Sequence, residues 1–486
     1  MHIRSQRPAP CSSRKDARLG AAASLLLAGL AGCAAVGPDY REPALTLPAT
    51  WHRSVSSGEA ASAESAGNLS RWWQRLNDPT LSALIDRALA SSTDLRTAQA
   101  KLREARARRA LASANLFPTL SASASGSRAK SGAEAGSGST SELYRAGFDA
   151  AWEPDVFGGN RRGVEAAQAD LESSAARMYA TQVSVAAEVA LNYVEVRAFQ
   201  ARLAIARSNL ASQSETLQLT DWRAQAGLVS SLDVEQSRAN REQTRAQIPS
   251  LETSLAEAEH RLAILLGQAP GAVHDQLAAA APIPVVPDRV AVGIPADTLH
   301  QRPDVRAAER QLAAETARVG QAVAARYPSF NLSGSIGLEA LTLGALGSSD
   351  AIARSLLASV AATIFDGGRL RQKVEIQSAV QEQALVAYEA AVLSALEEVE
   401  NALVALANSR QREAALRSAA EAARNAALLA RQRYESGLID FQTVLDTERT
   451  VLTIEDSQAS SQAEGATALV QLYKALGGGW SARSAE

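Results

Sequence analysis

The sequence has little of what enzymes and membrane-spanning helices require. Its 486 residues include two cysteines and five histidines, and the histidines are scattered without a metal-ligand spacing. There is no Gly-rich phosphate loop followed by Lys-Ser or Lys-Thr, and no run of 18 apolar residues. We therefore predict no cofactor, no metal, no enzyme activity and no transmembrane helix. An enzyme stays open only as an alternative in which distant Ser and Asp residues meet in the fold.

An excess of either charge is also missing. The formal net charge is −3, and Lys and Arg gather only in short stretches such as Lys101 to Arg109. Such a stretch predicts a solvated helix face, so we expect no nucleic-acid partner. Hydrophobic residues make up 46% of the chain, which is long enough for more than one packed unit.

The N-terminus reads as an export signal. Five basic residues precede an apolar run from Ala21 to Leu30 that is too short for a permanent membrane span. The run ends in Leu30-Ala31-Gly32-Cys33, which resembles the bacterial lipobox and implies lipidation of Cys33. The alternative is an ordinary signal peptide that contains a cysteine. Cys11 lies in the segment to be removed, so the mature chain would form no disulfide. By resemblance to lipoprotein sorting, Ala34 in place of Asp favours the outer membrane.

The rest of the chain is one unit written twice. Asp94 and Pro118 recur as Asp304 and Pro328, each 210 positions later. Further landmarks follow in the same order: Phe157-Gly158-Gly159 with Phe365-Asp366-Gly367-Gly368, and Gly227-Leu228 with Gly437-Leu438. Because Pro and Gly punctuate both copies at matching places, the similarity indicates a duplication and not chance likeness between alanine-rich helices.

Long helices dominate each copy. From Gly163 to Gly227 there is no proline and no internal glycine, and a matching stretch runs from Arg369 to Ser436. At 1.5 Å per residue the first stretch would extend roughly 96 Å. Such lengths predict a helical bundle or coiled coil and not a compact globule.

Two segments in each copy alternate between apolar and polar residues. They are 119–128 and 144–152 in the first copy, and 330–338 and 356–364 in the second. Period-two alternation over about ten residues is typical of membrane β-strands, with one face to lipid and one to water. Four strands cannot close a spanning barrel, since such barrels start at about eight strands, so the chain must oligomerise if they span a bilayer.

These features together resemble the TolC-like outer-membrane factors, specifically the OprM/NodT-type outer-membrane lipoproteins of tripartite RND-type efflux systems. The resemblance rests on the lipobox, on the duplicated helix-hairpin-helix plan and on motifs that cover nearly the whole mature chain. The motifs are Trp72-Trp73, 265–271, Arg302-Pro303-Asp304-Val305, Tyr327-Pro328-Ser329-Phe330, Phe365-Asp366-Gly367-Gly368 and 473–480.

The resemblance implies a mainly α protein with a small membrane β part. In the family, long coiled helices form a trimeric periplasmic α-barrel, and four strands from each chain complete a twelve-stranded outer-membrane β-barrel. The expected partners are two further copies of the chain, outer-membrane lipid, a periplasmic adaptor and an inner-membrane pump of RND type. The expected function is a gated conduit that exports small molecules such as drugs. The alternatives are the exit duct of a type I protein secretion system and a structural lipoprotein that tethers the envelope.

The expected domain layout follows from the duplication and the resemblance. It is a signal peptide at 1–32, an anchor and equatorial segment at 33–93, a first repeat at 94–267 with a hairpin at about 118–153, an equatorial linker at 268–300, a second repeat at 301–476 with a hairpin at about 328–364, and a tail at 477–486.

By resemblance, the periplasmic tips turn at Gly227-Leu228-Val229 and at Gly437-Leu438. A glycine suits a helix reversal because it tolerates a left-handed conformation. We expect these tips to contact the adaptor, with Leu228, Val229 and Leu438 exposed. Plain turn chemistry is the alternative, although it explains the glycines and not the aliphatic residues.

The resemblance also implies a gate just inside the tips. Asp446 matches the acidic ring of the constriction, where three symmetry-related carboxylates would repel each other and attract cations. Asp233 and Tyr434 match the residues that lock the closed state by hydrogen bonds between helices. Gln442 stands where OprM-type relatives have an apolar residue, which predicts a weaker lock. Without the resemblance, an exposed aspartate such as Asp446 would indicate only a solvated helix face.

Overall fold

A computed structural model describes residues 35–52, 69–134, 138–287, 290 and 295–480. The expected signal peptide, Cys33 and the last six residues lie outside this part of the chain. The described residues belong to two compact units, which we treat separately. The first comprises residues 1–42, Ala105–Leu171 and Arg310–Leu385, and the second comprises Pro43–Glu104, Glu172–Glu309 and Val386–Glu486.

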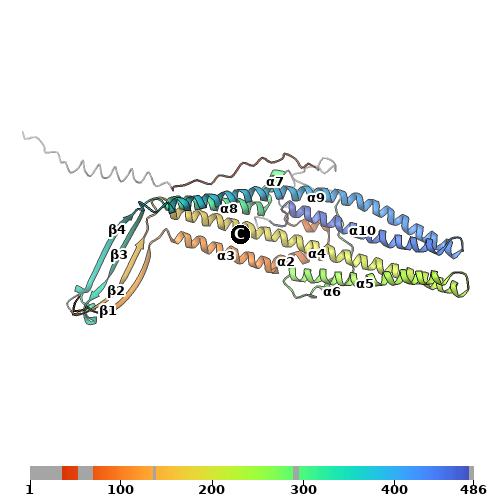
Figure 1. Cartoon of the computed structure of the whole chain (residues 1–486), viewed down its shortest axis with the longest axis horizontal. Coiled ribbons are helices and arrows are strands. Elements are labelled where there is room, and N and C mark those ends of the chain that lie inside the picture. The colour runs from red at the N-terminus through yellow and green to blue at the C-terminus, as the bar shows by residue number, and fades with distance from the viewer. Residues whose placement is uncertain (1–34, 53–68, 135–137, 288–289, 291–294, 481–486) are drawn as a thin grey trace, which may run out of the picture. The chain divides into compact units, whose positions relative to one another are not determined.

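Helices and strands recur in the same order in the two copies, and all but the second strand of each hairpin have the same length (Figure 1). The first copy contains α3 (Thr93–Ala114), β1 (Thr119–Lys130), β2 (Thr140–Trp152), α4 (Gly159–Gln225) and α5 (Ser231–Leu265). The second contains α8 (Pro303–Ala324), β3 (Ser329–Ala340), β4 (Ile352–Ala361), α9 (Arg369–Glu435) and α10 (Phe441–Ala475). Both long helices have 67 residues. The prediction of a mainly helical, internally duplicated chain with four strands is confirmed.

Short helical elements lie before, between and within these copies. They are η3 (Trp72–Leu76) and α2 (Pro79–Ser91) before the first copy, α6 (His274–Leu277) and α7 (Pro295–Gln301) between the copies, and η4 (Leu343–Gly347) and η5 (Ser349–Ala351) between β3 and β4. None of the described helices combines the length and the apolar composition needed to cross a membrane.

The four strands form one antiparallel sheet in the order β1-β2-β3-β4. The central pairing joins the two copies, since β2 of the first lies beside β3 of the second with Ala150 opposite Gly334. Gly147 and Gly337 face each other there, and a Cβ on either residue would come within 2.8 Å of backbone atoms of the other strand. Side chains are therefore excluded from this pair. Strands β1 and β4 are the two edges of the sheet.

The expected strand at 356–364 is partly wrong. Strand β4 starts earlier, at Ile352, and ends at Ala361, so Ile364 lies in a bend beyond it and is 94% exposed. The reason is the start of α9. Asp366 accepts hydrogen bonds from the backbone N–H groups of Gly368 at 2.9 Å and Leu370 at 2.7 Å, so the chain must leave the sheet before it.

The core of the second unit brings distant motifs together. Trp72 stacks on Tyr473 with ring centroids 5.2 Å apart, and Trp73 meets the Trp72 ring edge-on at 5.8 Å. All three rings are at most 1% exposed, so they hold the segment before the first copy against the end of the second. The tail continues this packing, because Trp480 stacks on Tyr179 at 4.8 Å.

Candidate functional site

The two helical turns at the predicted tips have the same backbone construction. At the first, the N–H of Gly227 donates to Ala224 O at 2.9 Å and that of Leu228 donates to Arg223 O at 2.8 Å. This pair of bonds is a Schellman cap, and it requires the positive φ of 72° at Gly227. The second turn repeats it at Gly437, with φ 73°. The glycines thus satisfy the last carbonyls of α4 and α9.

The helices that follow the turns are each capped by one aspartate and one hydroxyl residue. The hydroxyl residue is the cap in the first copy, and the aspartate is the cap in the second. Ser230 caps α5, and the Asp233 carboxylate accepts a hydrogen bond from the backbone N–H of Ser230 at 3.0 Å. In the second copy the cap is Asp440, which accepts from the backbone N–H of Thr443 at 2.9 Å and from its hydroxyl at 2.6 Å. The Thr443 hydroxyl bond is the main reason that the pKa of Asp440 lies below its usual value.

The apolar residues of the tips divide into two kinds. Leu228 and Leu438 are 68% and 73% exposed, as expected. Val229 is not, because it packs with Ile439 against a buried cluster that includes Tyr434 and Phe441. The expectation that Val229 is exposed is therefore wrong. One residue beyond the leucine, the chain turns back toward the space between the helices, and a β-branched side chain fills that space.

The candidate gate residue Asp446 lies on α10 with a side chain that is 60% exposed. The amide of Gln442, one turn earlier, donates to its carboxylate at 3.1 Å. The guanidinium of Arg449 lies 4.0 Å from the same carboxylate. Gln442, which departs from the OprM-type pattern, therefore contacts the candidate gate residue Asp446 directly.

Tyr434 lies inside the cluster behind the tips and is 3% exposed. Its ring lies 5.5 Å from that of Phe441, and the guanidinium of Arg223 lies 4.4 Å from its centre while donating to Tyr434 O at 2.6 Å. Its hydroxyl makes no hydrogen bond to the described residues. Burial raises the pKa of this phenol and the charge of Asp233 adds to the rise, whereas the charge of Arg223 lowers it. Asp233 is held in its capping box, so within one chain the two candidate lock residues do not bond to each other.

A buried polar contact near the candidate gate residue was missed by the sequence analysis. Thr216 of α4 donates to Glu448 of α10 at 2.5 Å, and both side chains are buried. Burial raises the pKa of Glu448 above its usual value, and Thr216 and Arg431 offset this only in part. A signal was available, because Phe441, Leu445 and Glu448 share one helical face and the glutamate interrupts its apolar pattern.

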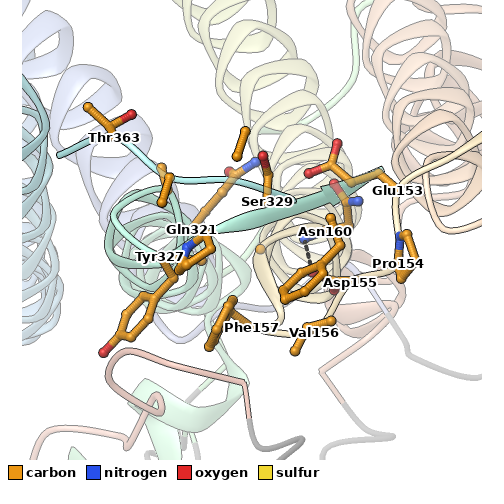
Figure 2. A pocket seen from close by; sticks show the side chains of 17 residues that line it. Glu153, Pro154, Asp155, Val156, Phe157, Asn160, Gln321, Tyr327, Ser329 and Thr363 are labelled. Carbon is orange, nitrogen blue, oxygen red and sulfur yellow. Dashed lines mark hydrogen bonds between the residues drawn. The ribbon is translucent and has the colours of Figure 1, made fainter. Parts of the chain in front are cut away.

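The junction between strands and helices contains a second candidate site, a cavity of about 380 Å³ (Figure 2). Phe157 lines it and stacks on Tyr327 with ring centroids 4.7 Å apart. The Asp155 carboxylate accepts from the backbone N–H groups of Asn160 at 3.1 Å and Arg161 at 2.8 Å, which starts α4. The lining has two carboxylates and no histidine or cysteine. No described cluster of His, Cys, Asp and Glu has the makeup of a metal site.

Comparison with protein families matches both copies of the repeat. The model of the "Outer membrane efflux protein" family fits residues 84–268 and again 294–478. The two matches correspond to the two copies, and together they cover most of the chain.

Individual relatives match over nearly their whole length. Nodulation protein T of Rhizobium leguminosarum bv. trifolii is 31% identical, over 93% of this chain and 96% of that protein. Outer membrane protein OprJ of Pseudomonas aeruginosa is 32% identical, over 94% and 95%.

Solved channels share the fold. The outer-membrane channel OprN aligns with a TM-score of 0.86 and 38% identity, over 92% of this chain and 99% of OprN. The open state of the Neisseria gonorrhoeae MtrE outer membrane channel aligns with a TM-score of 0.82 and 31% identity, over 92% and 98%. The chain therefore belongs to the outer membrane efflux protein family, whose members are outer-membrane channels of tripartite efflux pumps and not enzymes.

Proposed function

We propose that three copies of this chain form a gated duct that receives small molecules from an RND-type inner-membrane pump through a periplasmic adaptor. The open four-stranded sheet is the observation that carries the proposal. In a bilayer the outer edges of β1 and β4 must find backbone partners, and four strands are too few to do so within one chain. Three copies supply twelve strands, and the helix pairs continue as the periplasmic part of the duct.

The domain layout is part of this proposal. Residues 33–93, 268–300 and 477–486 would form an equatorial collar around the duct. The packing of Trp72 and Trp73 on Tyr473 supports a collar that ties the start of the mature chain to its end.

The proposed gate is a ring of Asp446 carboxylates, one from each copy, with Asp233 and Tyr434 behind it. Three like charges at one constriction attract cations and keep the closed pore selective. Exposure of Asp446 and its contact with Gln442 support this role, because a polar residue on that face keeps the carboxylate in place.

Single-channel conductance of the purified protein in planar bilayers tests the gate. Asp446→Ala should conduct several-fold better than the parent, with unchanged trimer content. Asp221→Ala is the matched control, because Asp221 is also an exposed helix aspartate that accepts from a glutamine four residues away, at 2.7 Å. An equal rise in both variants, or none in Asp446→Ala, would show that Asp446 is not the gate.

Cys33 is the proposed site of the lipid anchor. The lipobox-like Leu30-Ala31-Gly32-Cys33 and the outer-membrane location of the family support this assignment. Cells fed labelled palmitate should label the wild type and leave Cys33→Ser unlabelled. Label that persists in Cys33→Ser would instead favour an ordinary signal peptide and another site of acylation.

Small molecules are the proposed cargo. Two relatives in Pseudomonas putida are named a pyoverdine export outer membrane protein and a toluene efflux pump outer membrane protein. A host that lacks its own outer-membrane channel, supplied with this chain and a cognate pump and adaptor, should lower its toluene accumulation. Unchanged accumulation alongside normal trimer levels would argue against small-molecule efflux.

A further inference from the structure

Basic side chains lie on the apolar face of the four-stranded sheet. This face consists of every second residue of each strand, and it includes Leu120, Phe148, Ile336 and Leu356. The strand alternation places Arg128 and Lys130 of β1 on it, and Arg354 of β4 shares it because it pairs with Ile336. A membrane strand turns its apolar face to lipid, so these three cations lie on the lipid side of the sheet.

The three basic residues gather at the hairpin end of the strands. Lys130 is the last residue of β1, Arg128 stands two positions before it, and Arg354 stands two positions after the start of β4. At the helix end of the same face the strand residues are uncharged: they are Leu120, Trp152, Phe330 and Val360. The helices are periplasmic in this family, so the basic end of the sheet lies toward the cell exterior.

One acidic residue shares this end of the apolar face. Glu142 of β2 lies opposite Arg128, and the two form an ion pair at 3.3 Å. The hydroxyl of Tyr144 donates to the same carboxylate at 3.4 Å. Lys130 and Arg354 are exposed and form no ion pair with a residue that the structure describes. Two cations in each chain are therefore available to an anion from outside the chain.

The position of these cations selects the kind of anion. A Lys or Arg on the lipid face of a barrel costs about 2–4 kcal/mol at the bilayer midplane and about 0–1 kcal/mol near the interface. Their long side chains reach toward the headgroups, and Tyr144 at the same end is the aromatic type that favours this level. The anions at the headgroup level are phosphates, which Arg and Lys bind through charge-assisted hydrogen bonds.

The two available cations lie on the two edge strands. The central strands β2 and β3 have no basic residue on the apolar face. In the trimer of the proposed function, β4 of one copy adjoins β1 of the next. Each of the three joints would then bring Arg354 of one copy and Lys130 of its neighbour to the same end of one lipid-facing surface, with Arg128 close to Lys130.

We propose that each of these joints binds a phosphorylated lipid headgroup of the outer leaflet, with Arg354 of one copy and Lys130 of the next as its phosphate ligands. A glycolipid with two phosphate groups offers one to each strand, and its acyl chains lie along the apolar face below. The proposal rests on the trimer of the proposed function and adds a lipid ligand to it.

Native mass spectrometry of the full-length trimer in detergent, titrated with diphosphoryl lipid A, tests the site. The wild type should bind up to three lipid molecules per trimer. Lys130→Gln and Arg354→Gln should each weaken binding about fivefold, and the double variant about 30-fold. Equal affinity in the wild type and the double variant would overturn the proposal.

Arg145→Gln is the matched control. Arg145 is an exposed arginine of the same sheet, but it lies on the opposite face of β2 and pairs with Glu339 at 3.1 Å. This variant removes one positive charge and leaves the apolar face intact, so it should bind the lipid as the wild type does. A loss as large as that of Arg354→Gln would assign the binding to net charge and would overturn the site.

Two further ligands separate a lipid site from a site for free phosphate. Lipid A stripped of its phosphates should bind the wild type no better than the double variant does, because the cations then have no anion. Inorganic pyrophosphate at millimolar concentration should leave the bound lipid in place, since it lacks acyl chains. Displacement of diphosphoryl lipid A by pyrophosphate would overturn the lipid assignment.

The mass of the lipid-free protein separates failure of this inference from failure of the proposed function. A wild-type trimer that binds no diphosphoryl lipid A overturns the lipid site and leaves the duct intact. Monomeric wild-type protein would overturn the duct, and with it the joints on which the lipid site depends.

Discussion

The first helices of the two copies, α3 and α8, have the same length and differ in burial. Both contain 22 residues. In α8 a run of small apolar residues is buried, including Ala313, Ala314 and Val319, whereas α3 has Arg103, Glu104 and Arg109 at the same places, all exposed. The backbone plan was therefore copied while the surfaces diverged. The second copy therefore presents an apolar face to the rest of the chain at α8, and the first copy presents charged residues to solvent at α3.

The largest effect should come from the residue that starts each of these helices. Arg302 lies before α8, is 6% exposed, and contacts Asp304 at 2.6 Å, Glu398 at 2.7 Å and the carbonyl of Ala475 at 2.9 Å. Arg302→Ala removes these bonds and leaves two half-exposed carboxylates, so we expect the free energy of unfolding to fall by about 1.5–3 kcal/mol. Thermal unfolding followed by circular dichroism measures it.

The equivalent residue in the first copy supplies the control. Ser92 accepts a hydrogen bond from the backbone N–H of Asp94 at 3.3 Å, so it acts only as a helix cap. Ser92→Ala should cost about 1 kcal/mol. If Ser92→Ala and Arg302→Ala lower the free energy of unfolding equally, the charged groups around Arg302 add no stability beyond that of a helix cap.

The next effect separates the stacked Phe157 of the first copy from the exposed Phe365 of the second. Phe157→Ala removes a contact formed within each chain, whereas Phe365 is 91% exposed in one chain. We expect Phe157→Ala to lower the temperature of thermal unfolding, because it removes a stacked ring, and Phe365→Ala to leave that temperature unchanged. Only Phe157→Ala should also make the chain easier to cleave with protease. Equal effects of the two variants would show that the Phe157–Tyr327 contact adds no stability.

A third prediction separates the exposed leucines of the tips from the half-buried valine. Leu228→Ser and Leu438→Ser should weaken adaptor binding several-fold and leave thermal stability unchanged, because both side chains face solvent. Val229→Ser should lower stability, because Val229 packs against the Tyr434 cluster. Surface plasmon resonance and thermal unfolding measure the two effects. Stability loss in the leucine variants would assign them to the turn and not to the adaptor.

The smallest predicted effect is a pH dependence that only the second copy carries. The folded state raises the pKa of Glu448 by burial, so it favours the neutral acid. This stabilisation is complete below the unfolded-state pKa and is lost as the pH rises through the folded-state pKa. Wild-type protein should therefore gain stability from this group as the pH falls toward the ordinary glutamate pKa of 4.5, and Glu448→Gln should remove that gain.

The control lies on the equivalent helix of the first copy. Arg238 stands 210 positions before Glu448 and is exposed, and it pairs with Glu235 at 2.8 Å. Glu235→Gln should leave the pH dependence as it is in the wild type. A loss of the gain in Glu235→Gln, or its persistence in Glu448→Gln, would assign the dependence to other carboxyl groups.

Local signals explain what the sequence predicted well. The uninterrupted run after Gly163 and the glycines at 227 and 437 set the helix lengths and their ends, because each acts on its own backbone. Alternating residues predicted four strands, although the end of β4 was missed since it depends on the Asp366 cap.

Contacts between distant segments explain what was missed. Val229 was misplaced because its burial depends on Tyr434 and Phe441, some 200 residues away. Glu448 was overlooked because only its contact with Thr216 distinguishes it from a solvated glutamate. The gate and lock assignments rest on family resemblance, because no local signal distinguishes an exposed helix aspartate such as Asp446 from a solvated one.

The pairing of β2 with β3 has a consequence for assembly kinetics. The two paired strands belong to one chain, so half of the contacts between repeats in the proposed trimer form before any two chains meet. A single-repeat protein would need six molecules to build the proposed duct, and this chain would need three. The covalent link between the copies raises the effective concentration of the two repeats at every second contact. Fewer molecules also lose translational freedom as the ring closes. Gene duplication thus lowers the molecularity of pore formation.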